Sequence, residues 1–129
     1  MNSTGAPSSL SVLVLEDDML LAMDMEDHLI SRGFQVHGPF GRVGDAMDSI
    51  GDLEIDLAIV DLNLNGEFSF PVIELLNQRS VPVIVCSGYV ELPEVRTRLQ
   101  GIPHVGKPWM PERLDALMRD VLTATRVVG

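Results

Sequence analysis

Cysteines and basic residues are scarce in this sequence. Only one cysteine occurs among 129 residues, which excludes an internal disulfide and favours a reducing compartment. Lysine and arginine together number 9 against 19 aspartates and glutamates, so the net charge is −10. This acidity argues against direct binding to nucleic acid, which needs a basic surface. It fits a divalent cation or a basic protein surface as partner.

Long apolar runs are also missing. No segment approaches the roughly 18–20 apolar residues that span a membrane. The first nine residues, MNSTGAPSS, lack the charged start and apolar core of a signal peptide. We therefore expect a cytoplasmic protein without membrane contact. We also expect residues 1–9 to form a flexible arm and residues 10–126 to form one domain.

A regular alternation of apolar strands and helices is what the sequence does contain. The strand candidates lie at residues 10–15, 34–38, 55–62, 81–88 and within 103–108. The run at 10–15 is short and apolar without polar alternation, which is typical of a strand buried on both faces. A helical pattern follows each run, at residues 18–33, 42–51, 70–79, 92–101 and 110–126. Five repeats of strand and helix predict an α/β fold, with a doubly wound five-stranded parallel sheet covered by helices on both faces.

Polar residues lie at the carboxyl ends of four of these strands. In chain order they are Glu16, Asp17, Asp18, Asp61, Asn63, Ser87 and Lys107. Open parallel sheets bind their ligands outside the carboxyl ends of the strands, so these residues are candidates for one site. Crowded carboxylates repel one another unless a cation neutralises them, and carboxylate and backbone oxygens are typical ligands of Mg²⁺. The sequence therefore predicts a Mg²⁺ site at this edge of the sheet.

A metal ion beside Asp61 would allow its carboxylate to act as a nucleophile toward a phosphoryl group. A carboxylate can attack a phosphoryl donor and become an aspartyl phosphate. Mg²⁺ and Lys107 would take up the charge of the phosphoryl oxygens, and the hydroxyl of Ser87 would donate a hydrogen bond to one of them. Asp18 is instead predicted to cap the helix that follows it.

The combination of an acid pair, an aspartate, a serine and a Lys-Pro pair, each after its own strand, resembles the receiver domains of two-component response regulators. The resemblance covers about residues 10–124 and implies a flavodoxin-like fold with strand order 2-1-3-4-5 and five helices. It implies that Asp61 is the phosphoacceptor and that Ser87 and Lys107 act with it. The implied Mg²⁺ ligands are Glu16, Asp17, Asp61 and the backbone carbonyl of Asn63.

Three further stretches, at residues 61–76, 81–89 and 105–109, resemble a narrower group of receivers. This group occurs mainly in alphaproteobacteria and ends its fourth strand in a Phe-Ala-Thr-Gly-Tyr type sequence. The resemblance implies a sensor histidine kinase, of the HWE or a related family, or a phosphotransfer protein as phosphoryl donor. With no output domain in 129 residues, we expect phosphorylation-dependent binding of a downstream protein, or a role as relay or phosphate sink. Such a protein catalyses its own phosphorylation and dephosphorylation but is not a conventional turnover enzyme.

His104 departs from the common receiver pattern, which has Tyr or Phe three residues before the lysine. In the usual switch that ring fills the space left when the Ser or Thr hydroxyl moves toward the phosphate. We therefore expect a modified switch that involves Ser87, His104 and Tyr89. Two further expectations are that Cys86 is a buried strand thiol and that His28 lies among surface charges on the first helix.

Three alternative hypotheses remain open at this point. A receiver fold can serve as a binding module without phosphorylation, although such domains usually lack the acceptor or the acids. A toprim-like metal enzyme would need two carboxylates where Asp61 and Asn63 supply one. A flavodoxin would need a phosphate-binding loop after the first strand, where this chain has acids.

Overall fold

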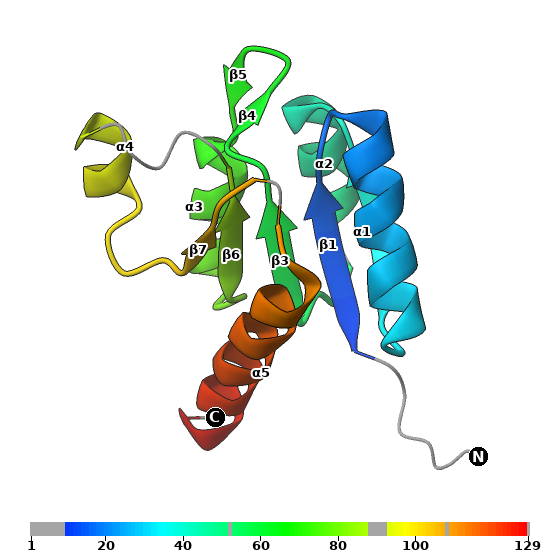
Figure 1. Cartoon of the computed structure of the whole chain (residues 1–129). Coiled ribbons are helices and arrows are strands. Elements are labelled where there is room, and N and C mark those ends of the chain that lie inside the picture. Colours follow the sequence, from blue (N-terminus) through cyan, green and yellow to red (C-terminus); the bar gives the residue numbers. More distant parts are fainter. Residues whose placement is uncertain (1–9, 52, 88–92, 108, 129) are drawn as a thin grey trace.

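A parallel sheet forms the centre of the molecule in the computed structural model, which describes residues 10–51, 53–87, 93–107 and 109–128. Its strands are β1 (Ser11–Leu15), β2 (Gln35–Phe40), β3 (Leu57–Val60), β6 (Val83–Cys86) and β7 (His104–Val105). They lie in the order β2-β1-β3-β6-β7 and pair in parallel (Figure 1). Counted within this sheet, the order is the predicted 2-1-3-4-5. The expected arm at residues 1–9 lies outside the described residues.

Helices follow the strands as the sequence predicts. They are α1 (Met19–Ser31), α2 (Val43–Ile50), α3 (Phe70–Gln78), α4 (Pro93–Arg98) and α5 (Pro111–Val128). Asp18 caps α1 as expected, because its side chain accepts hydrogen bonds from the backbone N–H groups of Leu20 and Leu21. The helix expected at 92–101 is shorter than predicted. No helix within the described ranges is both long and apolar enough to cross a membrane.

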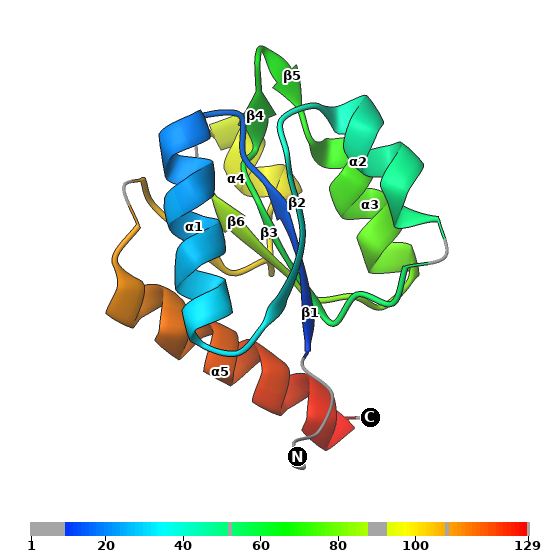
Figure 2. The ribbon, with the colours of Figure 1, turned by 90° about the vertical axis from the view of Figure 1, so that its right-hand side faces the viewer.

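Side chains of each strand alternate between two apolar layers. Val12 and Val14 of β1 pack in one cluster with residues of α1 and α5, such as Leu29. Leu13 and Leu15 pack in the other cluster with residues of α2 and α3. Figure 2 shows α1 and α5 on one side of the sheet and α2 and α3 on the other. This burial on both faces explains why the central strands β1, β3 and β6 lack polar alternation.

The strands end earlier than the apolar runs predict. Strand β3 stops at Val60 rather than at residue 62, and β6 stops at Cys86 rather than at residue 88. The chain leaves the sheet at these points to form the loops that carry polar residues. Strand β2 is the exception, because Phe40 still pairs with Leu15 and extends the strand two residues past its predicted end. Cys86 is buried as expected.

A β-hairpin that was not predicted from the sequence follows β3. Its strands are β4 (Asn63–Leu64) and β5 (Glu67–Phe68), which pair antiparallel. The two residues between them, Asn65 and Gly66, have φ values of 53° and 88°. Positive φ at both central residues is the geometry of a tight hairpin turn, and Asn-Gly is the dipeptide that adopts it most readily. The hairpin projects above the carboxyl edge of the sheet (Figure 1).

Candidate functional site

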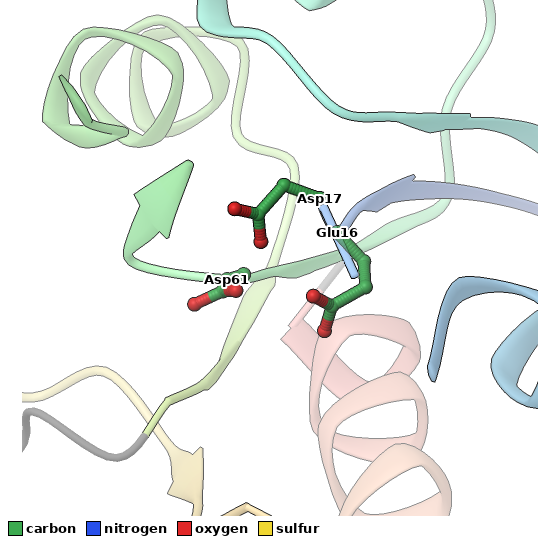
Figure 3. A group of neighbouring side chains, drawn as sticks. All are labelled: Glu16, Asp17 and Asp61. Carbon is green, nitrogen blue, oxygen red and sulfur yellow. The ribbon is translucent and has the colours of Figure 1, made fainter. Parts of the chain in front are cut away.

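Three carboxylates meet at the carboxyl ends of β1 and β3. Glu16, Asp17 and Asp61 each offer an oxygen atom, and these atoms lie within 4.8 Å of one another (Figure 3). The sheet fixes two of these residues, since the N–H of Glu16 donates to the carbonyl of Phe40 and the N–H of Asp61 donates to that of Leu15, both at 2.9 Å. Glu16 and Asp61 are buried, and Asp17 is half-buried. These three of the residues that were predicted to converge therefore do so.

Lys107 provides a positive charge inside this cluster. Its Nζ atom lies 2.6 Å from Oδ2 of Asp61 and 2.8 Å from Oε1 of Glu16. The other oxygen of Glu16 accepts a hydrogen bond from the backbone N–H of Asp18 at 3.0 Å. One ammonium thus bridges two buried carboxylates that come from different strands. These charge-assisted hydrogen bonds are the strong kind, because little water competes with them.

Burial sets the protonation behaviour of the cluster. It raises the pKa of the Asp61 and Glu16 carboxyl groups, although the hydrogen bonds with Lys107 oppose that change. For Lys107, burial disfavours the charged form, but the hydrogen bonds with Asp61 and Glu16 outweigh it and raise the pKa of the ammonium. Lys107 is therefore charged at neutral pH. The cluster then holds three acids against one base and can accept further positive charge.

The donor set fits a hard divalent cation. Carboxylate oxygens are the ligands that Mg²⁺ prefers, and the three found here come close enough together to share one ion. Asn63 lies against the same cluster, because its N–H donates to Oδ1 of Asp61 at 3.3 Å. Its side-chain oxygen is occupied in the hairpin, where it accepts from the N–H of Gly66 at 2.8 Å.

Two of the remaining predicted residues, Ser87 and His104, lie at the neighbouring strands β6 and β7. Ser87 directly follows β6, is fully buried, and donates its N–H to the carbonyl of Val105 at 3.2 Å. His104 is the first residue of β7 and is exposed. Tyr89, the third expected switch residue, lies outside the described residues. Burial raises the pKa of the Cys86 thiol to about 12, so this neighbour of Ser87 stays protonated at neutral pH.

Comparison with known proteins gives one curated relative of moderate similarity. No model of a known protein family matches the chain. The transcriptional regulatory protein MalR of Bacillus subtilis (strain 168) is 26% identical over 117 residues, which cover 86% of this chain and 49% of that protein. The chain therefore spans about half the length of this relative.

Solved structures decide the fold. A response regulator receiver domain protein (CheY-like) from Methanospirillum hungatei JF-1 matches with a TM-score of 0.85 at 20% identity, over 95% of this chain and 100% of that one. The PhyR stress response regulator matches with a TM-score of 0.75 at 25% identity, over 91% of this chain and 46% of that one. This chain has the fold of a response regulator receiver domain. The flavodoxin-like architecture inferred from the sequence is thereby confirmed.

The expectation that His28 lies among surface charges is wrong. Its Nε2 atom lies 2.7 Å from Oδ1 of Asp115 on α5, and its side chain is only 11% exposed. The ring also packs against Trp109, with 5.3 Å between the ring centroids. Acidic neighbours in the sequence suggested a surface position, but the side of α1 that carries His28 faces α5. The residue therefore belongs to the contact between these helices.

Two residues of the receiver fold contact the acid cluster without having been predicted to do so. The N–H of Asn65, at the hairpin turn, donates to Oδ2 of Asp17 at 2.9 Å. The hydroxyl of Ser69 donates to the backbone carbonyl of Asp61 at 2.7 Å. The Asn-Gly pair at residues 65 and 66 was a signal for the turn, but no local pattern places a turn beside a side chain 48 residues away.

Proposed function

We propose that this chain is a phosphoacceptor receiver whose Asp61 takes a phosphoryl group in a Mg²⁺-dependent reaction. The observation that carries the proposal is the surrounding of Asp61: a buried carboxylate, 2.6 Å from the ammonium of Lys107, beside two further acids. An isolated buried carboxylate would be costly, and a structural ion pair would need no second and third acid. The arrangement suits a group that must bind a cation and a phosphate together.

Asp61 would act as the nucleophile. One of its carboxylate oxygens attacks the phosphorus of a phosphohistidine, the P–N bond breaks, and the imidazole leaves with a proton from solvent. Lys107 stays close enough to Asp61 to donate to a phosphoryl oxygen, and the hydroxyl of Ser87 donates to another. Hydrolysis of the aspartyl phosphate by water reverses the modification. The protein thus catalyses its own phosphorylation and dephosphorylation without conventional turnover.

The proposed Mg²⁺ ligands are Glu16, Asp17, Asp61 and the backbone carbonyl of Asn63. A bound Mg²⁺ ion neutralises negative charge on the phosphoryl oxygens. Asp17 is the least buried of the three acids, which suits a direct ligand that exchanges with water. Glu16, already engaged by Lys107 and the N–H of Asp18, would set the charge balance of the site.

The partners follow from this chemistry. The phosphoryl donor would be a sensor histidine kinase, with the HWE family favoured by the fourth-strand sequence, or a phosphotransfer protein. Residues 10–126 would form the receiver, act in the cytoplasm, and need neither nucleic acid nor membrane contact. The change at Asp61 would reach a downstream protein through a switch of Ser87, His104 and Tyr89. A relay or phosphate-sink role would use the same chemistry.

Phosphorylation by a small donor tests the proposal. The chain is incubated with Mg²⁺ and phosphoramidate beside the Asp61→Asn variant, and intact mass is read for both. We expect one phosphoryl group on the wild type and none on the variant, because an amide is not a nucleophile here. Equal labelling of both would disprove the role of Asp61. No labelling of either, with the fold intact and a histidine kinase also ineffective, would favour a binding module that is not phosphorylated.

A further inference from the structure

The β4–β5 hairpin is anchored at its base to the backbone of the phosphoacceptor. Ser69, directly after β5, donates its hydroxyl to the carbonyl of Asp61 at 2.7 Å and to that of Leu62 at 3.1 Å. Its N–H also donates to the carbonyl of Leu62, at 2.8 Å. Ser69 is fully buried, so no water competes for these hydrogen bonds. The base of the hairpin therefore moves only together with the chain at Asp61.

The tip of the hairpin is anchored to a different strand end. The N–H of Asn65 donates to Oδ2 of Asp17, which follows β1. A hydrogen bond to Oδ2 fixes the rotation of this carboxylate without consuming Oδ1. The turn itself is held by the hydrogen bond from the N–H of Gly66 to Oδ1 of Asn63. Asp17 and Asp61 are thus joined by one short segment as well as by the sheet.

Packing does little to fix the tip. Asn65, Gly66 and Glu67 are exposed. An open groove of about 490 Å³ separates this part of the hairpin from the start of α2, with Arg42 and Asp45 on its far side. The turn is held by its own backbone geometry, by the hydrogen bond from the N–H of Asn65 to Asp17, and by a long contact from Nδ2 of Asn65 to the carbonyl of Gly41 at 3.5 Å.

We propose that the β4–β5 hairpin is a positioning element of the cation site, in which the N–H of Asn65 holds the carboxylate of Asp17 toward Asp61. The proposal rests on the proposed function, since it assigns to the hairpin the preorganisation of that Mg²⁺ site. Groups that orient the ligands of a metal commonly change its affinity by roughly 10–100-fold when they are removed. Within the hairpin, only the backbone carbonyl of Asn63 is itself a proposed ligand. The turn at Asn65 and Gly66 would not touch the metal and would act on the site through Asp17.

Gly66→Ala is the variant that tests this role. A Cβ at Gly66 meets no atom within 4 Å, but the φ of +88° is unfavourable for alanine, so the turn must change. Gly33→Ala is the matched control, because Gly33 has a φ of +91° and equally open surroundings. It lies in the turn between α1 and β2. The end of α1 that leads into this turn is at the opposite end of the sheet from the hairpin (Figure 1).

The affinity for Mg²⁺ alone, measured by calorimetric titration, is the readout. We expect Gly66→Ala to weaken binding roughly tenfold and Gly33→Ala to leave it within about twofold. Asn63→Ala, which removes only the acceptor for the Gly66 N–H, should weaken binding in the same direction. In an Asp17→Ala background, Gly66→Ala should have no further effect, because the side chain on which the turn acts is then absent.

Each remaining outcome decides between the two proposals. Equal affinity of the wild type, Gly66→Ala and Asn63→Ala would overturn the role of the hairpin and leave the metal site standing. Equal weakening by Gly66→Ala and Gly33→Ala would overturn it too, because general strain would then be the cause. A wild-type chain that binds no Mg²⁺ at millimolar concentration would overturn the metal site itself, and the hairpin proposal with it.

Discussion

Lys107 supplies positive charge where three acids meet. The acid run after β1 suggests a need for a metal, but the ammonium already bridges the two buried carboxylates, those of Glu16 and Asp61. It does not balance Asp17, which the hairpin holds instead. The fold therefore tolerates the acids without a metal and still has a site for one. A residue with a proposed role in phosphoryl transfer therefore also neutralises two buried carboxylates in the folded chain.

Replacing Lys107 with methionine tests its contribution to the stability of the fold. The variant leaves two buried carboxylates without their shared donor, so we expect the free energy of unfolding without metal to fall by about 2 kcal/mol. Urea unfolding followed by the fluorescence of Trp109, the sole tryptophan, measures the change. Mg²⁺ should restore part of the loss, because it supplies the missing charge. Arg119→Met, on the exposed side of α5, is the control. An unchanged unfolding midpoint for Lys107→Met would contradict the bridge.

The sequence predicted the members of the site better than their contacts. Parallel strands bring their carboxyl ends to one edge, so Glu16, Asp17 and Asp61 had to converge once the strands were recognised. That argument gives no information on rotamers or on which acid the ammonium contacts. The partner of Asp17 could not be found in this way, because it is a backbone N–H in a hairpin that was not predicted.

The contact between α1 and α5 depends on Asp115, which joins two side chains of α1. It accepts from His28 at 2.7 Å and from Nε of Arg32 at 3.1 Å. Partial burial opposes ionisation of Asp115, but these hydrogen bonds outweigh it and lower the pKa of the carboxyl group. A lowered pKa in the folded state means that the ionised carboxylate stabilises the fold at pH values above its unfolded pKa. That contribution is lost as the pH falls through the folded pKa.

Asp115→Asn should therefore destabilise the protein in a pH-dependent manner. We expect a loss of about 1 kcal/mol between pH 5 and pH 6, reduced by partial exposure to solvent, and a smaller difference from the wild type as the pH falls below about 4. Chemical unfolding of both proteins across this range measures it. Asp120→Asn, at an exposed position of α5, should show little effect. A difference for Asp115→Asn that stays constant down to pH 3 would rule out the ionised pair as its cause.

The elements with clear hydrophobic patterns were predicted well, and a short polar element was not. Strands β1 and β3 are uninterrupted apolar runs, and α1 has a cap and an apolar stripe, so each was placed within a few residues. The hairpin has only two residues in each strand, and its buried Leu64 is too short a pattern to predict a strand. Hydrogen bonds with Asp17 and Ser69, together with the burial of Leu64, hold it in place. Such tertiary anchors leave no periodic signal in a sequence.

Magnesium should stabilise the whole molecule. A ligand that binds only the folded state adds about 1.4 kcal/mol at a concentration ten times its Kd, which corresponds to a rise in Tm of a few degrees for a chain of this size. Thermal unfolding with Mg²⁺, and again after addition of a chelator, measures the effect and its reversal. In Asp17→Asn the rise should be much smaller. A Tm that millimolar Mg²⁺ does not change would argue against the site.

Lys107 is also the only lysine in the sequence. A protein labelled with ¹⁵N in lysine alone would therefore carry one labelled ammonium, and that ammonium lies between Asp61 and Glu16. Its NMR signal would report directly on the centre of the site, without assignment of the rest of the spectrum. Titration with a cation, a phosphoryl donor or a kinase could then be followed through one resonance. The single lysine of the chain is therefore a specific spectroscopic probe for binding and phosphorylation at this site.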